Sequence, residues 1–257
     1  MVKGLYTAYT GMIQQQKRLD TITNNLANAS TNGYKREGVT SISFREMLGI
    51  KIKDLSVPLI NEGIGYHSLG VKIGEGYTDY SQGSFKETGN TYDLALEGNG
   101  FFAISFMNKQ GEQSIKYSRD GQFTVDVDGY LRTLEGDYVQ GEAGDVVIPT
   151  DASRILVNIA GEIYADGEYV DTLKIVDFED YNYLKKYGEN LYDIVDGGVE
   201  KEADALLRQG YLEMSNINVV EEMVEMITIS RAYESNQKLI QTADEMLEKS
   251  VNQIGKV

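Results

Sequence analysis

The sequence predicts an α+β protein in which two terminal helices flank an irregular, antiparallel, β-rich middle. Apolar residues recur every seven positions near both ends of the 257-residue chain. The middle is rich in Gly, Tyr, Val and Asp, and turn residues separate its short alternating runs. We therefore expect helical segments at 1–34 and 213–257, an extended connector at 35–70 and a β-rich central domain at 71–212.

The first segment carries a heptad seam, the pattern of a coiled coil. Ala8 and Ile22 add apolar side chains at intermediate positions of the repeat, whereas Gln15 does not fit it. A helix with this pattern packs along another helix. Gly33, after Asn32, is a plausible left-handed stop. The seam residues are Leu5, Met12, Leu19 and Leu26.

The last segment repeats the pattern. Ser215, Asn216 and Asn218 offer caps ahead of it, and acidic residues follow where the helix dipole favours them. Counting Lys, Arg, Asp and Glu gives a net charge of about +4 for residues 1–36 and about −4 for residues 213–257. The two helices are thus complementary in sign, which biases their pairing weakly. The seam residues are Val219, Met226, Tyr233, Ile240, Leu247 and Ile254.

The middle reads as short β-strands. Turn signals at 97–100 and 126–129 separate apolar runs, as in β-hairpins. Spacing of this kind predicts a small antiparallel domain. The expected strands lie within 92–96, 101–105, 116–125, 130–134, 155–159, 162–165, 169–178 and 191–195.

Asparagines stand where the first helix should disfavour them. Asn24, Asn25 and Asn28 lie on about one helical turn, and each costs a few tenths of a kcal/mol relative to Ala. A buried amide without partners would cost roughly 1–3 kcal/mol. We hypothesise that these amides pair between neighbouring copies of the chain and set their register. Alternatively, the two terminal helices pair with each other inside one globular monomer.

Composition excludes several classes of function. A net charge of −16 makes nucleic acid and anionic membranes poor partners. The absence of cysteine excludes disulfides and thiol chemistry. No apolar run approaches the ~18 residues of a membrane span, so no membrane insertion is expected. Residues 1–18 lack the apolar core of a cleaved signal, so export would need another route.

Motifs for catalysis or metal binding are weak. Residues 124–135 place acids and a glycine somewhat as an EF-hand loop does, but the flanks alternate as strands, so a hairpin turn is the expected structure and a weak calcium site the alternative. His67 is the only histidine, and no nucleophile motif accompanies it. We expect no enzyme activity, no metal and no cofactor.

Three ordered blocks resemble the axial proteins of the bacterial flagellum, the basal-body rod and hook family. The first block reads LYTAYTGMIQQQKRLDTITNNLANASTNGYKR. The middle block includes YTDYSQGSFKETGNTYDLALEGNGFFAI and YSRDGQFTVDVDGYLRT, and the last reads QGYLEMSNINVVEEMVEMITISRAYESNQKLIQTADEML. The last block is most similar to members of the distal rod, while residues 45–69 do not separate these from the proximal-rod members.

The resemblance implies a structural subunit of the flagellar rod that transmits torque from motor to hook. Such proteins leave the cell through the flagellar type III export apparatus and polymerise helically through their terminal helices, in contact with other rod and hook proteins of the cell envelope. The seam residues and Asn24, Asn25 and Asn28 would form the assembly interface. Rival interpretations are a proximal-rod or hook-type paralogue, a peptidoglycan hydrolase and a monomeric calcium-binding β module.

Overall fold

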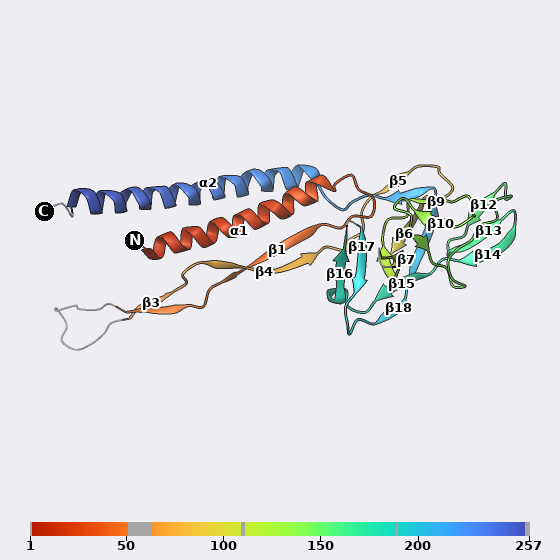
Figure 1. The fold of residues 1–257 in the computed structure, drawn as a ribbon, viewed down its shortest axis with the longest axis horizontal. Helices are drawn as coiled ribbons and strands as arrows, with labels where there is room; N and C mark the ends of the chain where they lie inside the picture. Colours follow the sequence, from red (N-terminus) through yellow and green to blue (C-terminus); the bar gives the residue numbers. More distant parts are fainter. Residues whose placement is uncertain (1, 51–62, 109–110, 189, 255–257) are drawn as a thin grey trace. The chain divides into compact units, whose positions relative to one another are not determined.

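The computed structural model describes residues 2–50, 63–108, 111–188 and 190–254. It forms two compact units, each with its own internal packing (Figure 1). The helical unit comprises the described residues of 1–27, 37–79 and 218–257. The β unit comprises those of 28–36 and 80–217. The overall class is α+β, as predicted.

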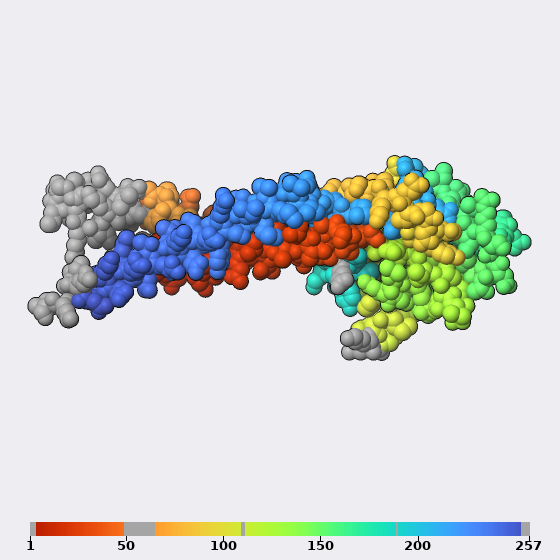
Figure 2. Space-filling model, turned by 90° about the horizontal axis from the view of Figure 1, so that it is seen from above, coloured from red at the N-terminus to blue at the C-terminus, as the bar shows by residue number. Residues whose placement is uncertain are grey.

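Two antiparallel helices run along the helical unit (Figure 1). They are α1 (Val2–Ala27) and α2 (Val219–Lys249), and α2 continues into a short π-helix, η2 (Ser250–Ile254). Figure 2 shows the two helices side by side. An ion pair joins Arg18 of α1 to Glu225 of α2, with 2.6 Å between Nη2 and Oε1. Both predicted terminal helices are confirmed, and they pair within a single chain.

The helix ends follow the local sequence. Of the three candidate caps of α2, Asn218 is the one that caps the helix, because its side-chain oxygen accepts two backbone N–H groups of the first turn. Helix α1 ends at Ala27, earlier than the predicted stop. Gly33 does have a left-handed backbone, with φ at 66°, but it lies in the turns beyond the helix. Asn28 instead bonds Thr31 through both backbone and side chain, and such local bonds compete with the helix.

A two-stranded ribbon completes the helical unit (Figure 1). Strand β1 (Glu37–Ser43) pairs antiparallel with β4 (Val71–Thr78), and β2 (Met47–Ile50) pairs with β3 (Gly63–His67). Three of these strands lie in the stretch expected to be an extended connector; residues 51–62 of that stretch lie outside the described residues. Helix α1 contacts the ribbon, since Gln14 donates a hydrogen bond to Ser41.

Strand β7 (Phe101–Met107) organises the β unit. One of its edges pairs with β8 (Gln113–Ser118). Its other edge pairs first with β15 (Ile175–Phe178) and then with β11 (Tyr138–Val139). All of these pairings are antiparallel, and they belong to one nine-stranded sheet. The predicted antiparallel β-rich middle is therefore confirmed.

The core of the β unit lies on both faces of β7. Phe101 and Ala103 belong to one buried cluster together with Tyr117 and Tyr192. Phe102 belongs to the other cluster. Alternate side chains of a strand point to opposite faces, so residues 101–104 are all apolar because neither face of the strand meets water there.

The remaining strands are short and lie around this centre. Strands β12, β13 and β14 form a three-stranded sheet, while β6 pairs with β19 and β5 with β20. Their bounds are β5 (Phe85–Glu87), β6 (Leu94–Gly98), β9 (Phe123–Val125), β10 (Leu131–Thr133), β12 (Ile155–Val157), β13 (Glu162–Ala165), β14 (Glu168–Thr172), β16 (Leu184–Tyr187), β17 (Leu191–Ile194), β18 (Glu200–Glu202), β19 (Ala205–Gln209) and β20 (Tyr211–Glu213), with a 3₁₀ turn, η1, at Tyr181–Tyr183.

One of the two predicted hairpins is confirmed. Strands β9 and β10 pair across the turn at 126–129. The turn at 97–100 does not form a hairpin, because β6 pairs with β19 and β7 with other neighbours. Gly98 and Gly100 both have positive φ, at 113° and 147°. That backbone, open to glycine but rare for other residues, redirects the chain between two separate sheets.

Candidate assembly surfaces of the terminal helices

The facing sides of α1 and α2 bury a mixture of apolar and polar groups. Ala8 and Ile22 of α1 and Ile229 of α2 are buried. Asn25 and Glu222 are buried with them. Buried polar groups require partners, so this face of the helix pair is built on specific polar contacts as well as on apolar packing.

The predicted seam residues lie at half-buried positions. This holds for all four in α1 and for Met226, Tyr233, Ile240 and Leu247 in α2. Val219, at the start of α2, is exposed, and the side chain of Ile254 lies outside the described residues. None of the described seam side chains is fully buried, so coiled-coil packing of these helices stays a prediction.

Asn25 has its partners within its own chain. Its Nδ2 donates to the carbonyl oxygen of Glu37 at 2.9 Å, and its Oδ1 accepts the N–H of the same residue at 3.0 Å. Nδ2 also lies 3.4 Å from Oε2 of Glu222. The side chain is 1% exposed. The amide therefore fastens the first residue of β1 to both helices, which differs from the hypothesised contact between copies of the chain.

The other two predicted amides are less enclosed. Asn24 is exposed on α1, and Asn28 is half-buried just beyond the end of the helix. The Oδ1 of Asn28 accepts a hydrogen bond from the Thr31 hydroxyl at 3.3 Å. Asn25 and Asn28 thus have different hydrogen-bond partners within the chain.

The outward sides of both helices carry apolar stripes. Val220, Val224 and Ile227 of α2 are 71%, 60% and 54% exposed, and their spacing places them on one face. We call these three residues the outer α2 stripe. The outer α1 stripe consists of Tyr6, Tyr9 and Ile13, which are also exposed and spaced along one face.

Sequence reasoning missed both outer stripes. The stronger seven-residue repeat drew attention to the seam, although the spacing of Val220, Val224 and Ile227 by four and then three residues is itself visible in the sequence. A helix with apolar residues on two faces needs two partners. That second periodicity is the signal that could have identified the outer stripes.

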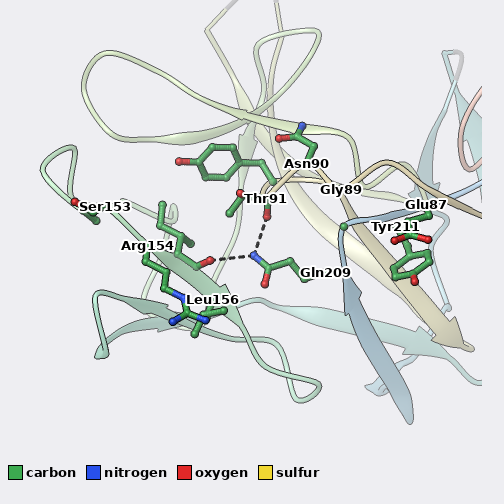
Figure 3. A pocket seen from close by; sticks show the side chains of 13 residues that line it. Glu87, Gly89, Asn90, Thr91, Ser153, Arg154, Leu156, Gln209 and Tyr211 are labelled. Atoms are coloured by element: carbon green, nitrogen blue, oxygen red, sulfur yellow. Dashed lines mark hydrogen bonds between the residues drawn. The ribbon is translucent and has the colours of Figure 1, made fainter.

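An open pocket of about 470 Å³ lies in the β unit beside β12 and β19 (Figure 3). Gln209 spans it, donating from Nε2 to the carbonyl oxygens of Thr91 at 2.9 Å and Ile155 at 3.2 Å. The charged residues among those that line it are Glu87 and Arg154. Glycoside hydrolysis uses a pair of carboxylates, and Glu87 is the one carboxylate among these lining residues. The pocket therefore does not favour the hydrolase interpretation.

The loop at 124–135 is the turn of a hairpin, as expected. The N–H of Gly129 bonds the carbonyl of Asp126 at 2.9 Å, and an ion pair of 2.8 Å joins the Asp126 carboxylate to Arg132. Within the described ranges, no group of three or more His, Cys, Asp or Glu side chains is placed to hold a metal ion.

No described helix combines the length and the apolar character that a membrane crossing requires.

Three family models match the chain in order. A model described as flagella basal body rod protein matches residues 5–35. A model described as the flagellar hook protein FlgE/F/G D1 domain matches residues 95–165. A model described as the flagellar basal body rod FlgEFG protein C-terminal region matches residues 208–254. The first match covers most of α1, the last covers all of α2, and the middle match lies within the β unit.

Full-length relatives agree with the family models. The chain is 35% identical to the flagellar basal-body rod protein FlgG of Bacillus subtilis, over 98% of this chain and 99% of that protein. It is 35% identical to FlgG of Agrobacterium fabrum, over 95% and 97%. It is also 32% identical to the flagellar hook-basal body complex protein FlhO of Bacillus subtilis, over the whole of both. The chain therefore belongs to the family of flagellar basal-body rod proteins, within which it is similar to FlgG, and it is a structural subunit of the rod.

Proposed function

We propose that copies of this protein polymerise helically through the outer stripes of α1 and α2, and that the polymer transmits torque from the motor to the hook. The observation that carries the proposal is the second apolar face of α2. Soluble monomers rarely expose contiguous apolar surface without a partner for it. Burial of each exposed Val or Ile side chain would contribute about 1–2 kcal/mol to a contact.

The predicted seam has a different place in this proposal. We infer that the four α1 seam residues, Leu5, Met12, Leu19 and Leu26, line the inner side of the helix pair together with the α2 seam. That pairing presents the outer stripes to neighbouring copies. Asn24 and Asn28 stay candidates for contacts between copies, whereas Asn25 orders its own chain. In this scheme the segments 1–34 and 213–257 serve assembly.

The other expected partners follow from the resemblance and are part of the proposal. Other rod proteins and hook proteins would contact the two ends of the polymer. The flagellar export apparatus would deliver the chain out of the cell, and a chain with no cysteine passes a narrow channel without forming disulfides. A structural role, with no catalysis, is the function that this geometry supports best.

The test places a charge on the outer α2 stripe. The double substitution Val224→Asp and Ile227→Asp should leave the fold of the isolated chain unchanged, because both side chains are exposed. It should abolish swimming and remove the protein from purified basal bodies. The matched control is Gln237→Asp, an exposed polar position on the same helix, which should preserve both. Normal rods built from the double variant would contradict the proposal.

A further inference from the structure

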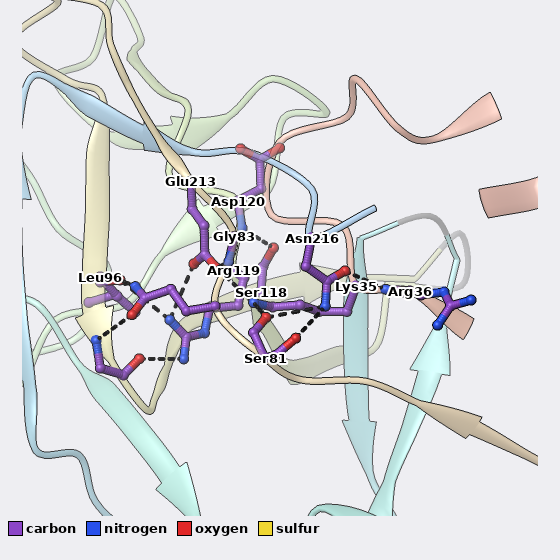
Figure 4. A network of polar contacts seen from close by, with 12 residues as sticks. Lys35, Arg36, Ser81, Gly83, Leu96, Ser118, Arg119, Asp120, Glu213 and Asn216 are labelled. Carbon is purple, nitrogen blue, oxygen red and sulfur yellow. Dashed lines mark hydrogen bonds and ion pairs between the residues drawn. The ribbon is translucent and has the colours of Figure 1, made fainter. Parts of the chain in front are cut away.

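The chain passes between its two units after residues 27, 36, 79 and 217. The β-unit segments beside these four passages gather around one buried carboxylate, that of Glu213 (Figure 4). Its side chain is 0% exposed. Each segment that carries a helix or the ribbon is therefore tied, within the β unit, to the same small cluster.

Glu213 binds three segments with its own atoms. Its Oε1 accepts hydrogen bonds from Nζ of Lys35 at 2.7 Å and from the N–H of Gly83 at 2.9 Å. Its Oε2 lies 3.3 Å from Nη1 of Arg119. Its backbone carbonyl accepts the N–H of Gly33 at 2.8 Å. The segment after α1, the segment after the ribbon and the strand before α2 thus share one anchor.

The two cations extend the anchor into the sheet. Lys35 also donates to the carbonyl oxygen of Ser81 at 2.8 Å, so it joins two of the segments directly. Arg119 donates to the carbonyl oxygen of Gly98 at 2.7 Å, and its guanidinium lies 5.3 Å from the centre of the Phe101 ring. Arg119 follows β8 and Phe101 begins β7, so the cluster connects to the central sheet.

Backbones approach closely at the same place. A Cβ atom at Gly83 would lie 1.9 Å from the carbonyl oxygen of Met214, and one at Gly33 would lie 2.5 Å from the carbonyl carbon of Arg119. No side chain fits at either glycine without movement. The segments therefore touch one another directly, and the charges hold them in that contact.

The cluster is a poor device for stability alone. It buries two cations with one anion, and desolvation lowers the pKa of Arg119 while Glu213 opposes that shift. Replacing buried ion pairs by apolar residues is often neutral or stabilising. Directional, charge-assisted hydrogen bonds instead fix the geometry of the segments that they join. This favours a positional role for the three residues.

We propose that Lys35, Glu213 and Arg119 form a joint that keeps the helix-bearing and ribbon-bearing segments rigid on the β unit. In the rod, and resting on the function proposed above, torsional load would pass through this joint between the terminal helices and the β unit. The rigidity of the segments does not depend on that function and is measurable in the isolated chain.

The first test is Lys35→Met in the full chain, followed by amide hydrogen exchange. Glu213 and Arg119 remain as a neutral pair, so the β unit should fold with nearly the parent melting temperature. The amides of Gly33 and Gly83 should exchange at least tenfold faster, because their segments lose a shared anchor. The amides of Leu131 and Leu173, bonded elsewhere in the β unit, should change less than twofold.

Two outcomes would overturn the joint. If no amide changes, the cluster does not restrain the segments. If the exchange rates of all amides rise by the same factor, the cluster contributes only to the overall stability of the fold. Glu213→Gln serves as a second variant, since glutamine still accepts hydrogen bonds but loses the charge, and it should loosen both glycines more than Lys35→Met does.

The control is Glu97→Gln, which breaks a 2.6 Å ion pair with Arg208 whose side chains are 42% and 46% exposed. It should leave the exchange of Gly33 and Gly83 unchanged. In cells, the Lys35→Met protein should enter basal bodies at parent levels yet reduce swimming speed at least twofold in viscous medium. Parent swimming speed in viscous medium would contradict the transmission of torsional load through the joint. Absence of both the parent and the Lys35→Met protein from basal bodies would contradict the proposed function and leave the exchange result standing.

Discussion

Asn25 shows how a residue that disfavours helices can be retained inside one. Its amide donates to the backbone carbonyl of Glu37 and accepts from the N–H of the same residue, as the backbone of a neighbouring strand would. It also lies against Glu222, an acid buried in α2. A helix that must hold an extended segment at its side needs a donor and an acceptor on one short side chain, and Asn provides both.

Replacing Asn25 by Ala should destabilise the isolated chain by about 1–3 kcal/mol. Alanine raises helix propensity, but the N–H and carbonyl of Glu37 and the Glu222 carboxylate all lose a buried partner. Urea denaturation measures the effect. Asn24→Ala, at an exposed neighbouring position, is the control and should change stability by less than about 0.5 kcal/mol. Equal effects of the two substitutions would refute this role for Asn25.

Asp120 gives the β unit a pH dependence. Burial raises the pKa of its carboxyl from 3.8 to about 6, against hydrogen bonds from the Gln122 N–H and the Asn190 amide. The folded chain therefore holds this proton more tightly than the unfolded chain does. The contribution of Asp120 to stability is most favourable below about pH 4, declines as the pH rises to about 6 and stays low above that.

Asp120→Asn should accordingly be more stable than the parent at pH 7.5, by about 1–2 kcal/mol. It should also lose part of the decline in stability between pH 4 and pH 6. Thermal unfolding of both chains across this range provides the measurement. If the variant is less stable than the parent at pH 7.5, the carboxylate is contributing favourable bonds that outweigh its burial.

At the scale of elements, the local sequence predicts which segments form helices or strands. It does not predict which strands pair with one another. The heptad repeats identify α1 and α2, and the turn at 126–129 identifies the β9–β10 hairpin. The turn at 97–100 misleads because β19, more than a hundred residues later in the chain, pairs with β6. No local pattern shows that a distant strand will compete for an edge.

The assembly surface was likewise predictable only in part. The seven-residue repeat predicts the seam. It does not predict which face of each helix the rest of the chain covers, because that depends on contacts such as the ion pair of Arg18 with Glu225. Asn25 could be flagged as unusual, yet its partner Glu37 lies after a turn whose geometry the sequence does not reveal. The outer stripes became distinguishable from the seam once the helix pair fixed the inner face.

The two helices should depend on each other. Helix α1 contains Gly, Thr and Asn residues, and an isolated helix of such composition is marginal in water. A chain truncated after Ile217 should lose roughly twice the helical circular dichroism expected from removing α2 alone. Truncation after Lys249, which keeps α2, should preserve the signal. A loss limited to α2 would mean that α1 is held by the ribbon instead.

At the scale of the whole molecule, we propose that the two units have separate roles. The helical unit offers apolar stripes to neighbouring copies, and the β unit anchors the segments that carry it. This division agrees with the burial of Asn25 within the helical unit and of Glu213 within the β unit, while apolar side chains stay exposed along the helices. Burial of the exposed stripes is then an event of assembly.

The most direct test measures that burial by thiol labelling. Because the chain has no cysteine, a single Val224→Cys substitution gives one reactive site. Val127→Cys, at a position 90% exposed in the β unit, is the control. We predict that a maleimide labels both variants readily in the dilute chain, and that in purified basal bodies the rate for Val224→Cys falls at least tenfold more than the rate for Val127→Cys. Equal labelling of the Val224→Cys site in the free chain and in basal bodies would contradict assembly through the outer α2 stripe.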